Sequence, residues 1–362
     1  MSCKILKDVV LPVKSSLKLS DLETSGNYQV FGASGLVGYR NSFQTGKESV
    51  GVIKDGAGIG RVTILPKHSS VLGTMQILEP KEGISNSYLF FFLSHLNLGK
   101  SFTGSTIPHI YFKNYCKAQF PEISYKKQCE IAGKLKKISE LIGVKRKQET
   151  KLDSLVKSRF MEMFGEWDLS FQKENWIKLS DLTNMYTGTT PKTEIEEYWN
   201  GLIPWVTPAE LDKDSYIITD TERHITEKGQ KSKSLNMMPI GTVLLSTRAP
   251  IGKVAICGVP MTCNQGFKNF ECLKKLNPTY LFYLLKLNND WLQTQGTGTT
   301  FKEISKSKAG NIRIPVPKMS NQEAFTKFYN LVDKSRFVVQ QEIKDLQELL
   351  DSKMEEYFGG EE

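Results

Sequence analysis

Two short runs of glycine and small hydroxyl residues could bind phosphate. They lie at Thr103–Thr106 and Thr297–Thr300, and each precedes residues that are compatible with a helix. Backbone N–H groups, hydroxyls and nearby lysines in such a place suit phosphate oxygens. The phosphate-contact candidates are Ser105, Thr106, Lys113, Thr299, Thr300 and Lys302. An ordinary capped turn has the same composition and stays an alternative for both runs.

A second group of side chains could read the edges of DNA bases. Arginine can donate two hydrogen bonds to guanine in the major groove, and asparagine or glutamine can pair with adenine in the same way. Basic residues bracket two expected strand turns, one in each half of the chain, and an Asn-Gln pair follows the second turn. The candidates for base contacts are Lys54, Arg61, Arg248, Lys253, Asn264 and Gln265.

The motifs of common enzymes are missing or stand in the wrong context. Gly56–Gly60 is similar to a dinucleotide-binding loop, but the strand-like run Val62–Pro66 follows it where a helix is required. Asn277–Tyr280 is similar to a methyltransferase tetrapeptide, but it is also typical of a helix N-cap and first turn. The four histidines are widely spaced and the six cysteines include no C-x-x-C pair. We therefore expect neither catalysis nor a metal site.

Length and composition favour an ordinary globular protein of two or three domains. The chain has 362 residues, 39% of them hydrophobic and 24% charged, with a net charge of +9. The longest apolar or aromatic runs, Tyr88–Leu93 and Tyr280–Leu285, are too short to span a bilayer. The first residues include Lys4, Lys7 and Asp8 rather than the apolar region of a secretory signal. We expect a cytoplasmic protein without a membrane partner.

The sequence repeats itself in a fixed order. Lys18–Leu22 returns identically as Lys178–Leu182, at an offset of 160 residues. Ile59–Ile64 returns as Ile251–Ile256 at an offset of 192, and later matches keep an offset of 192 or 194. The growth of the offset places 32 extra residues in the second copy, between these two matches. The pattern indicates a tandem duplication in which the second copy carries additional surface.

Each copy divides into a β-rich part and a long helix. The β-rich parts, at about residues 1–125 and 166–319, contain strand-like runs such as Ser49–Ile53 and Thr242–Ser246. Each part also has one short aromatic helix, which begins near Ser85 or near Asn277. The remaining segments, 126–165 and 320–362, each predict one long helix, with Gly165 and Gly359 at the places of C-caps.

The two long helices carry the apolar seam of a coiled coil. Alternating steps of four and three residues from Ile131 meet seven apolar residues in ten, and the same steps from Phe325 meet eight in ten. The polar seam residues Lys145 and Glu149 have apolar counterparts in the second helix, and Arg336 has an apolar counterpart in the first. Unequal seams favour pairing of the two helices with each other. The helix-pairing candidates are Ile131, Leu135, Ile138, Ile142, Leu152, Val156, Val332, Val339, Ile343, Leu346 and Leu350.

Charge also differs between the helices. Residues 126–160 hold 11 Lys or Arg against 4 Asp or Glu, a net charge of +7. The matched window 320–354 holds 5 against 6, a net charge of −1. Opposite charge is consistent with pairing, and the basic helix could also face phosphates or an acidic partner. A solvated lysine-rich face is the alternative.

This order of β-rich domain, long helix, β-rich domain and long helix resembles the specificity subunit of type I restriction–modification systems. The resemblance covers nearly the whole chain. The first copy has Gly73–Thr74 where Gln265–Gly266 would align and lacks a Trp-containing run, so it is similar to a different subtype. In the second copy five runs, in this order, are similar to the start of a target-recognition domain: Thr187–Lys192, Tyr198–Trp199, Ile203–Val206, Ile225–Gly229 and Asn264–Phe267.

The resemblance implies an α+β fold and a protein without catalytic activity of its own. Two tandem target-recognition domains, 1–125 and 166–319, would each read one half of a bipartite, asymmetric site in double-stranded DNA. The helices 126–165 and 320–362 would pack as an antiparallel coiled coil and set the gap between the half-sites. The remaining candidates for DNA contacts are His109, Thr189, Thr190, Lys192, Trp205 and Lys268.

The resemblance also implies partners. Two methyltransferase subunits would methylate adenine at N6, and restriction subunits that translocate DNA would join them. S-adenosylmethionine, ATP and magnesium would belong to these partners, so we expect no cofactor on this chain. Two alternatives stay open: a specificity module detached from a fused methyltransferase–nuclease, and a DNA-binding regulator that acts alone.

Overall fold

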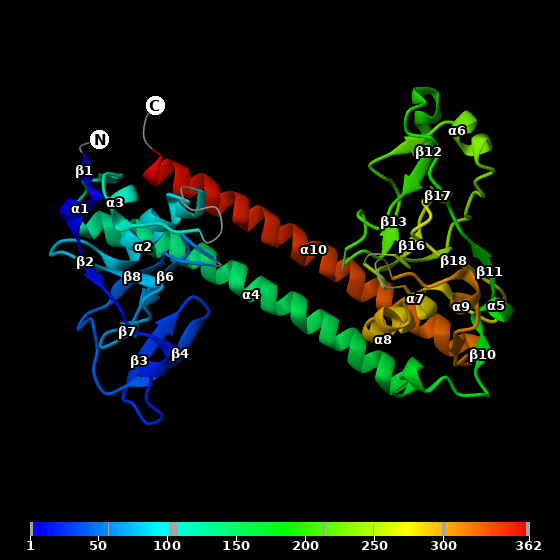
Figure 1. Cartoon of the computed structure of the whole chain (residues 1–362), viewed down its shortest axis with the longest axis horizontal. Coiled ribbons are helices and arrows are strands. Elements are labelled where there is room, and N and C mark those ends of the chain that lie inside the picture. The colour runs from blue at the N-terminus through cyan, green and yellow to red at the C-terminus, as the bar shows by residue number, and fades with distance from the viewer. Residues whose placement is uncertain are drawn as a thin grey trace. The chain divides into compact units, whose positions relative to one another are not determined.

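The computed structural model describes residues 3–56, 58–100, 108–212, 214–248, 250–298 and 302–359 (Figure 1). The chain forms two compact units. The first consists of Met1–Glu149 with Val338–Glu362, and the second of Thr150–Phe337. Each unit contains a β-rich globular part together with segments of both long helices. No helix in the described ranges is both long and apolar enough to cross a membrane.

The globular part of the first unit is built on two sheets whose strands pair mostly antiparallel. A four-stranded sheet has the order β2-β8-β5-β6 and a three-stranded sheet the order β4-β3-β7, while β1 pairs with β9. The strands are β1 (Cys3–Ile5), β2 (Val10–Lys14), β3 (Tyr28–Gly32), β4 (Gly35–Arg40), β5 (Ser49–Ile53), β6 (Val62–Leu65), β7 (Ser70–Val71), β8 (Met75–Pro80) and β9 (Gln119–Pro121). The expected strand at Ser49–Ile53 is confirmed, and every one of its residues is buried.

Helix α2 (Asn86–His95) carries the core of this unit. It begins where predicted, because the Ser85 hydroxyl accepts a hydrogen bond from the N–H of Tyr88 and caps the first turn. The Tyr88 ring packs edge-on against Phe120 and also contacts Phe358. The short helices α1 (Leu6–Val9) and α3 (Phe112–Tyr115) complete the globular part.

The second unit has the same plan with a larger sheet. Its five-stranded sheet has the order β11-β18-β15-β16-β13, a three-stranded sheet has the order β14-β12-β17, and β10 pairs with β19. The strands are β10 (Ile177–Lys178), β11 (Thr183–Tyr186), β12 (Trp199–Val206), β13 (Ile217–Ile218), β14 (His224–Ile225), β15 (Val243–Leu245), β16 (Val254–Cys257), β17 (Thr262–Cys263), β18 (Asn269–Cys272) and β19 (Arg313–Ile314). The helices are α5 (Leu179–Leu182), α6 (Glu227–Ser232), α7 (Pro278–Leu287), α8 (Asn289–Thr294) and α9 (Lys306–Gly310).

Helix α7 is the counterpart of α2. The Asn277 side chain accepts hydrogen bonds from the N–H groups of Thr279 and Tyr280, with Pro278 in the first turn, so the segment is a capped helix as predicted. The aromatic face of α7 meets both long helices: Tyr283 contacts Phe160 and Phe325. The apolar residues of α7 therefore bind the sheet to the helical part of the unit.

The longer second copy adds a small core of its own. Trp199 and Trp205 pack edge-on with ring centroids 5.1 Å apart, and Ile225 and Leu235 complete the cluster. This cluster joins β12, β14 and the segment after α6. The additional residues thus form a folded extension of the globular part.

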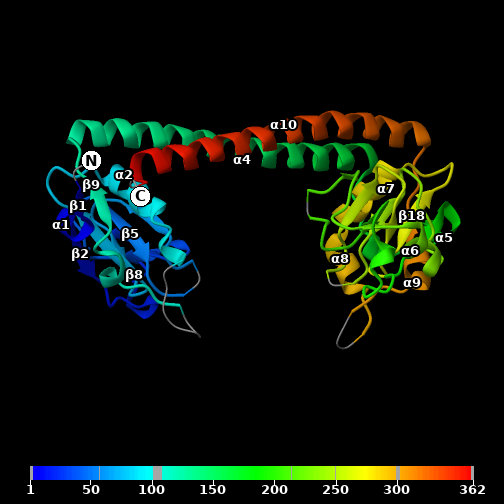
Figure 2. The same ribbon diagram turned by 90° about the horizontal axis from the view of Figure 1, so that it is seen from above.

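The two long helices, α4 (Tyr125–Phe164) and α10 (Met319–Phe358), have 40 residues each. At about 1.5 Å per residue, each is about 60 Å long. Segments of the two helices run side by side in each unit (Figure 2). Gly165, with a φ of 82°, ends α4, and its N–H donates to the Met161 carbonyl at 2.7 Å.

Polar contacts fix the direction of the two helices within each unit. In the first unit Lys145 lies 2.6 Å from Glu342, and the Gln340 amide donates to Glu149 at 2.8 Å. The residue number rises along α4 while it falls along α10, so the segments are antiparallel. In the second unit the Arg336 guanidinium donates to Asp153 at 2.8 Å. Three polar residues of the predicted seams, Lys145, Glu149 and Arg336, thus have polar partners on the other helix. The other two, Arg159 and Lys353, pair with glutamates on their own helices.

The predicted helix-pairing residues lie on the less exposed face of each helix. The most buried of them are Ile131, Leu135, Ile142, Val156, Val332 and Val339. Those at the ends of the helices also pack against the globular parts: Ile131 and Leu135 join the core that contains α2. Val156 and Val332 join the core that contains α7.

Candidate functional site

Four loops of the second unit come together through hydrogen bonds. The Thr247 N–H donates to the Gly266 carbonyl at 2.7 Å, and the Ile304 N–H donates to the Thr247 carbonyl at 3.1 Å. The Thr190 hydroxyl donates to the Gln265 side-chain oxygen at 2.8 Å. The loops lie at residues 187–192, 246–248, 264–267 and 302–304. Most of the candidates predicted for the second copy therefore belong to one surface.

Three charges form a chain at the centre of these loops. The Arg248 guanidinium lies 2.7 Å from one carboxylate oxygen of Glu303, and the Lys268 ammonium lies 3.0 Å from the other. The Lys268 side chain is 7% exposed and that of Arg248 is 47% exposed. The hydrogen bond from Arg248, together with Lys268, holds the pKa of Glu303 below its usual range. The group keeps a net charge of +1, and its exposed member is Arg248.

Other predicted residues shape the loops beside this trio. The Asn264 side-chain oxygen accepts a hydrogen bond from the Gly266 N–H at 2.8 Å, so its amide stabilises the turn. The Lys253 ammonium donates to the Pro208 carbonyl at 2.8 Å. Gln265 is exposed, and its side-chain oxygen accepts the hydrogen bond from the Thr190 hydroxyl. Of these residues, Gln265 is the best placed to meet a ligand.

Two tryptophans hold the loop at 187–192 through hydrogen bonds to its backbone. The Trp205 indole N–H donates to the Thr189 carbonyl at 3.1 Å, and the Trp199 indole N–H donates to the Lys192 carbonyl at 3.1 Å. Trp205 is only 3% exposed, so it holds the loop and does not present a face to a ligand. The Arg223 guanidinium lies 3.5 Å from the centre of the Trp199 ring.

The first unit has an equivalent arrangement with different side chains. His109 and Asp55 form a bridge, with Nδ1 2.6 Å from the carboxylate, and the Gly56 N–H donates to the Pro108 carbonyl at 3.3 Å. In the second unit the corresponding bridge joins Arg248 and Glu303. His109 precedes Glu303 by 194 residues, which is an offset of the repeat, and Asp55 precedes Arg248 by 193. The same backbone hydrogen bond adjoins both pairs, from Ile110 to Lys54 in the first unit and from Ile304 to Thr247 in the second. The duplicated scaffold therefore carries unlike charged pairs at the same place.

Further predicted residues of the first unit lie around this bridge. The exposed Arg61 side chain donates to the Ala33 carbonyl at 2.9 Å and lines a hollow of about 240 Å³. The Lys113 ammonium lies 5.7 Å from the centre of the Tyr111 ring. Lys54 is half-buried, and its carbonyl accepts from the Ile110 N–H at 2.9 Å. Arg61 and Lys113 are thus the cations that reach the surface here.

Four of the phosphate-contact candidates cannot be placed. Ser105, Thr106, Thr299 and Thr300 lie outside the described residues. Lys302, which adjoins one of these runs, is exposed. In the sequence, Asp55 precedes the first run and His109 follows it. Arg248 precedes the second run and Glu303 follows it in the same way.

Sequence reasoning missed Asp55 and Glu303. Both are acidic, whereas contacts to phosphates and to guanine or adenine are typical of basic, amide and hydroxyl side chains. Glu303 becomes relevant because the fold brings it against Arg248 and Lys268, and no spacing rule predicts such a pairing. The repeat held a usable signal, since His109 and Glu303 align. Within the described residues no cluster of three or more His, Cys, Asp or Glu side chains could hold a metal ion.

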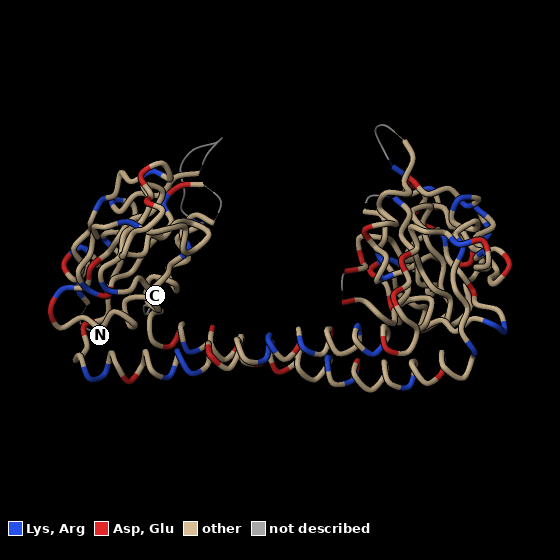
Figure 3. The backbone as a smooth tube through the Cα atoms, turned by 90° about the horizontal axis from the view of Figure 1, so that it is seen from below, with Lys and Arg blue, Asp and Glu red and all other residues tan. Residues whose placement is uncertain are grey.

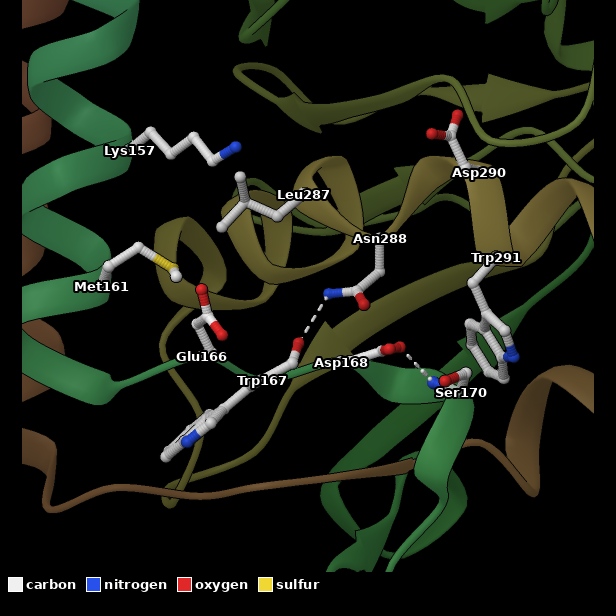
Figure 4. A pocket seen from close by; sticks show the side chains of 10 residues that line it. All are labelled: Lys157, Met161, Glu166, Trp167, Asp168, Ser170, Leu287, Asn288, Asp290 and Trp291. Carbon is white, nitrogen blue, oxygen red and sulfur yellow. Dashed lines mark hydrogen bonds between the residues drawn. The ribbon is translucent and has the colours of Figure 1, made fainter.

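A hollow of about 440 Å³ lies between α4, the linker that follows it and α7–α8 (Figure 4). Asn288 bonds the linker beside this hollow: its side chain donates to the Trp167 carbonyl at 3.1 Å and accepts from the Leu169 N–H at 2.9 Å. Asp168 accepts from the N–H of Ser170, and this hydrogen bond lowers the pKa of Asp168. These hydrogen bonds hold the linker against α7 and α8, so we assign the residues around the hollow a structural role.

The long helices present two kinds of exposed surface. Lys and Arg recur along α4 (Figure 3). In the first unit Leu141 and Val144 of α4, with Val338 and Leu349 of α10, are exposed apolar residues. Leu141 and Leu349 each directly precede a seam position, whereas the core residue Ala132 directly follows one. The exposed apolar residues therefore flank the seam on the side away from the globular part.

Comparison with known proteins places this geometry in a family. The family model of the type I restriction modification DNA specificity domain matches residues 4–154 and 173–348. The MjaIX specificity subunit of Methanocaldococcus jannaschii is 41% identical over 174 residues, which cover 47% of this chain and 40% of that protein. The EcoR124I/EcoR124II specificity subunit of Escherichia coli is 26% identical over 222 residues, covering 59% and 53%. The chain thus spans about half the length of the curated relatives it matches.

Solved structures share the fold. The S subunit of a type I restriction–modification system from M. genitalium superposes with a TM-score of 0.63 at 18% identity, covering 100% of this chain and 96% of that one. A chain from a study of complex assembly and conformational transition of the type I system gives a TM-score of 0.55 at 14% identity, covering 99% and 97%.

Proposed function

The chain belongs to the type I restriction modification DNA specificity family, and on that premise we propose that it reads a bipartite, asymmetric site in double-stranded DNA. It performs no bond chemistry itself. The first recognition domain, residues 1–125, reads one half-site, and the second, residues 166–319, reads the other. The observation that carries this proposal is the duplicated bridge, Asp55–His109 in one unit and Arg248–Glu303 in the other. One scaffold with unlike charged pairs suits two different half-sites.

The side chains around each bridge supply the contacts. In the second half-site Arg248 and Gln265 meet base edges in the major groove, while Lys192 and Lys302 meet phosphates. In the first half-site Arg61 meets bases, and Lys113 with the hydroxyls of Ser105 and Thr106 meets phosphates. Lys54, Lys253, Asn264 and Trp205 hold the loops.

The long helices set the gap between the half-sites. In this proposal residues 126–165 and 320–362 pair along their length as an antiparallel coiled coil. The antiparallel contacts within each unit support this arrangement, since Lys145, Glu149 and Arg336 each have a polar partner on the other helix. A stiff pair of helices makes the spacing a property of helix length.

Two methyltransferase subunits dock on the helices and recognition domains in the cytoplasm. The exposed apolar residues beside the seam, among them Leu141 and Leu349, support a helical partner there, because such a partner would remove their apolar surface from water. Restriction subunits join this complex. S-adenosylmethionine, ATP and magnesium are held by the partners.

The test is a map of N6-methyladenine in DNA from cells that express the chain with its methyltransferase subunit. A gapped, asymmetric motif that is methylated only when the chain is present is the expected result. Cells with an active methyltransferase subunit but without the chain are the control. Methylation that does not depend on the chain would contradict the proposal and favour a DNA-binding regulator that acts alone.

A further inference from the structure

The buried ammonium of Lys268 calls for a physical reason. Burying a charged side chain is costly unless it is paired and hydrogen-bonded. Lys268 is paired with Glu303 at 3.0 Å, and its ammonium also lies 3.4 Å from the Thr247 hydroxyl. A neutral residue can stand at this position, because the residue 192 positions earlier in the first unit is Gln76, which is also buried.

Lys268 is buried as a charged residue because it supports the ion pair between Arg248 and Glu303. Glu303 binds Arg248 through one carboxylate oxygen and Lys268 through the other. Without Lys268, the carboxylate would cancel the charge of Arg248, and the pair would have no net charge to attract the DNA backbone. With Lys268 in place, Glu303 holds the guanidinium while the group keeps a net positive charge. Gln76 occupies the equivalent place because the bridge of its unit is Asp55–His109, which contains no arginine to support.

The Arg248–Glu303 pair has a definite hydrogen-bonding pattern. Arg248 offers two or more donors, and beside them Glu303 offers carboxylate oxygens that can each accept more than one hydrogen bond. In the major groove a G·C pair offers two acceptors on guanine and then one donor, the amino group of cytosine. Donors on Arg248 and an acceptor on Glu303 match that order. A·T pairs and the reversed C·G pair present different orders.

We propose that Arg248 and Glu303 together read a single G·C base pair in the second half-site, and that Lys268 is the positioning residue of this pair. Arg248 donates to N7 and O6 of guanine, and Glu303 accepts from N4 of cytosine. The inference rests on the proposed function and adds to it a named base pair and two residues that act on it. In the first unit Asp55 and His109 present another pattern and read another base pair.

The test uses the full chain in complex with its methyltransferase subunit. Once the methylated motif is known, duplexes in which each base pair of the motif is replaced in turn are titrated by fluorescence anisotropy. We expect Arg248→Ala and Glu303→Gln each to lower discrimination at the same G·C pair of one half-site, by about 5- to 150-fold. Discrimination in the other half-site stays as in the wild type. Glu227→Gln, the same change on an exposed residue of α6, is the matched control and leaves both half-sites unchanged.

Lys268→Gln tests the positioning role with the residue that the first unit uses. We expect it to lower discrimination at the same base pair and to leave thermal unfolding close to the wild type. Lys268→Met, which removes the polar end, serves as the second variant. Discrimination that is unchanged in both folded variants contradicts the positioning role.

The other outcomes separate the two proposals. A methylated motif in which Arg248→Ala and Glu303→Gln act on different base pairs, or on none, overturns this inference and leaves the proposed function intact. A wild-type complex that directs no methylation and binds no gapped motif overturns the proposed function, and this inference with it.

Discussion

Arg336 joins the two long helices in the second unit, and its removal gives a prediction with a calculable size. Its side chain is 7% exposed; it donates to Asp153 at 2.8 Å on the facing helix and to Asp333 at 2.9 Å on its own helix. Asp153 is 57% exposed, so water screens that pair and it contributes at most about 1 kcal/mol. The hydrogen bond to the half-buried Asp333 contributes about 1.5–3 kcal/mol. Arg336→Met should therefore destabilise the folded chain by about 2–4 kcal/mol at neutral pH.

The loss should depend on pH. Burial raises the pKa of Asp333 above its ordinary value of 3.8, although Arg336 and Lys286 lower it. Removing Arg336 raises this pKa further, because the buried carboxylate loses its nearest cation. A carboxyl group whose folded pKa is raised destabilises the fold at pH values above that pKa, and the effect fades as the pH falls toward 3.8. The difference between Arg336→Met and the wild type should accordingly shrink as the pH is lowered from neutral.

The assay is urea unfolding of the wild type and the variant at several pH values, followed by circular dichroism. The matched control is the double variant Arg336→Ile with Asp333→Ser, which introduces the residues found at Ile142 and Ser139, 194 positions earlier in the repeat. Because it removes the buried carboxylate together with its cation, it should recover most of the stability and lose the pH dependence. A single variant as stable as the wild type at neutral pH would refute the reasoning.

Three further predictions concern the proposed interface and its partners. Arg61→Ala should change recognition of the first half-site alone, measured as a methylation map; altered bases in both half-sites would contradict the assignment. Removing seven residues from α4 together with seven from the facing part of α10 should change the gap of the methylated motif or inactivate the complex, and methylation at the original spacing would count against the spacer role. Leu141→Glu with Leu349→Glu should weaken assembly with the methyltransferase subunit by size-exclusion chromatography while circular dichroism stays unchanged; full assembly would move the docking surface elsewhere.

The elements of the fold that have a strong local signal could be predicted from the sequence. The caps at Ser85 and Asn277 use side chains within three residues of the groups they bond, so the starts of α2 and α7 follow from short motifs. The strand Ser49–Ile53 is a continuous β-prone run, and its burial on both faces agrees with that pattern. The turn at Gly58–Gly60 leads into β6, as the strand-like residues after it predicted.

The interface was harder to predict because it depends on contacts between distant residues. Glu303 matters through Arg248 and Lys268, which lie 55 and 35 residues away in the sequence. Trp205 was expected to contact DNA, but the fold places it beneath the loop at 187–192, where its indole N–H satisfies a backbone carbonyl. A tryptophan next to a glycine- and threonine-rich loop has the same sequence pattern in either role. Only burial, which arises from the packing of β12 against its neighbours, separates the two.

The residues that form the cores differ from those that form the bridges, and this explains how one scaffold could serve two half-sites. The cores around α2 and α7 are built from aromatic and aliphatic residues, and the charged side chains of the two bridges are not among them. The bridges themselves are held by backbone hydrogen bonds, such as Ile110 to Lys54 and Ile304 to Thr247, which any side chain permits. Under the proposed function, a change at Asp55 or Glu303 would therefore alter the pattern shown to DNA without replacing a residue of either core. The one side chain that must change together with the bridge is the buried residue behind it, glutamine in the first unit and lysine in the second. Because a buried lysine needs a carboxylate partner and a glutamine does not, that position and the bridge are expected to vary as a pair.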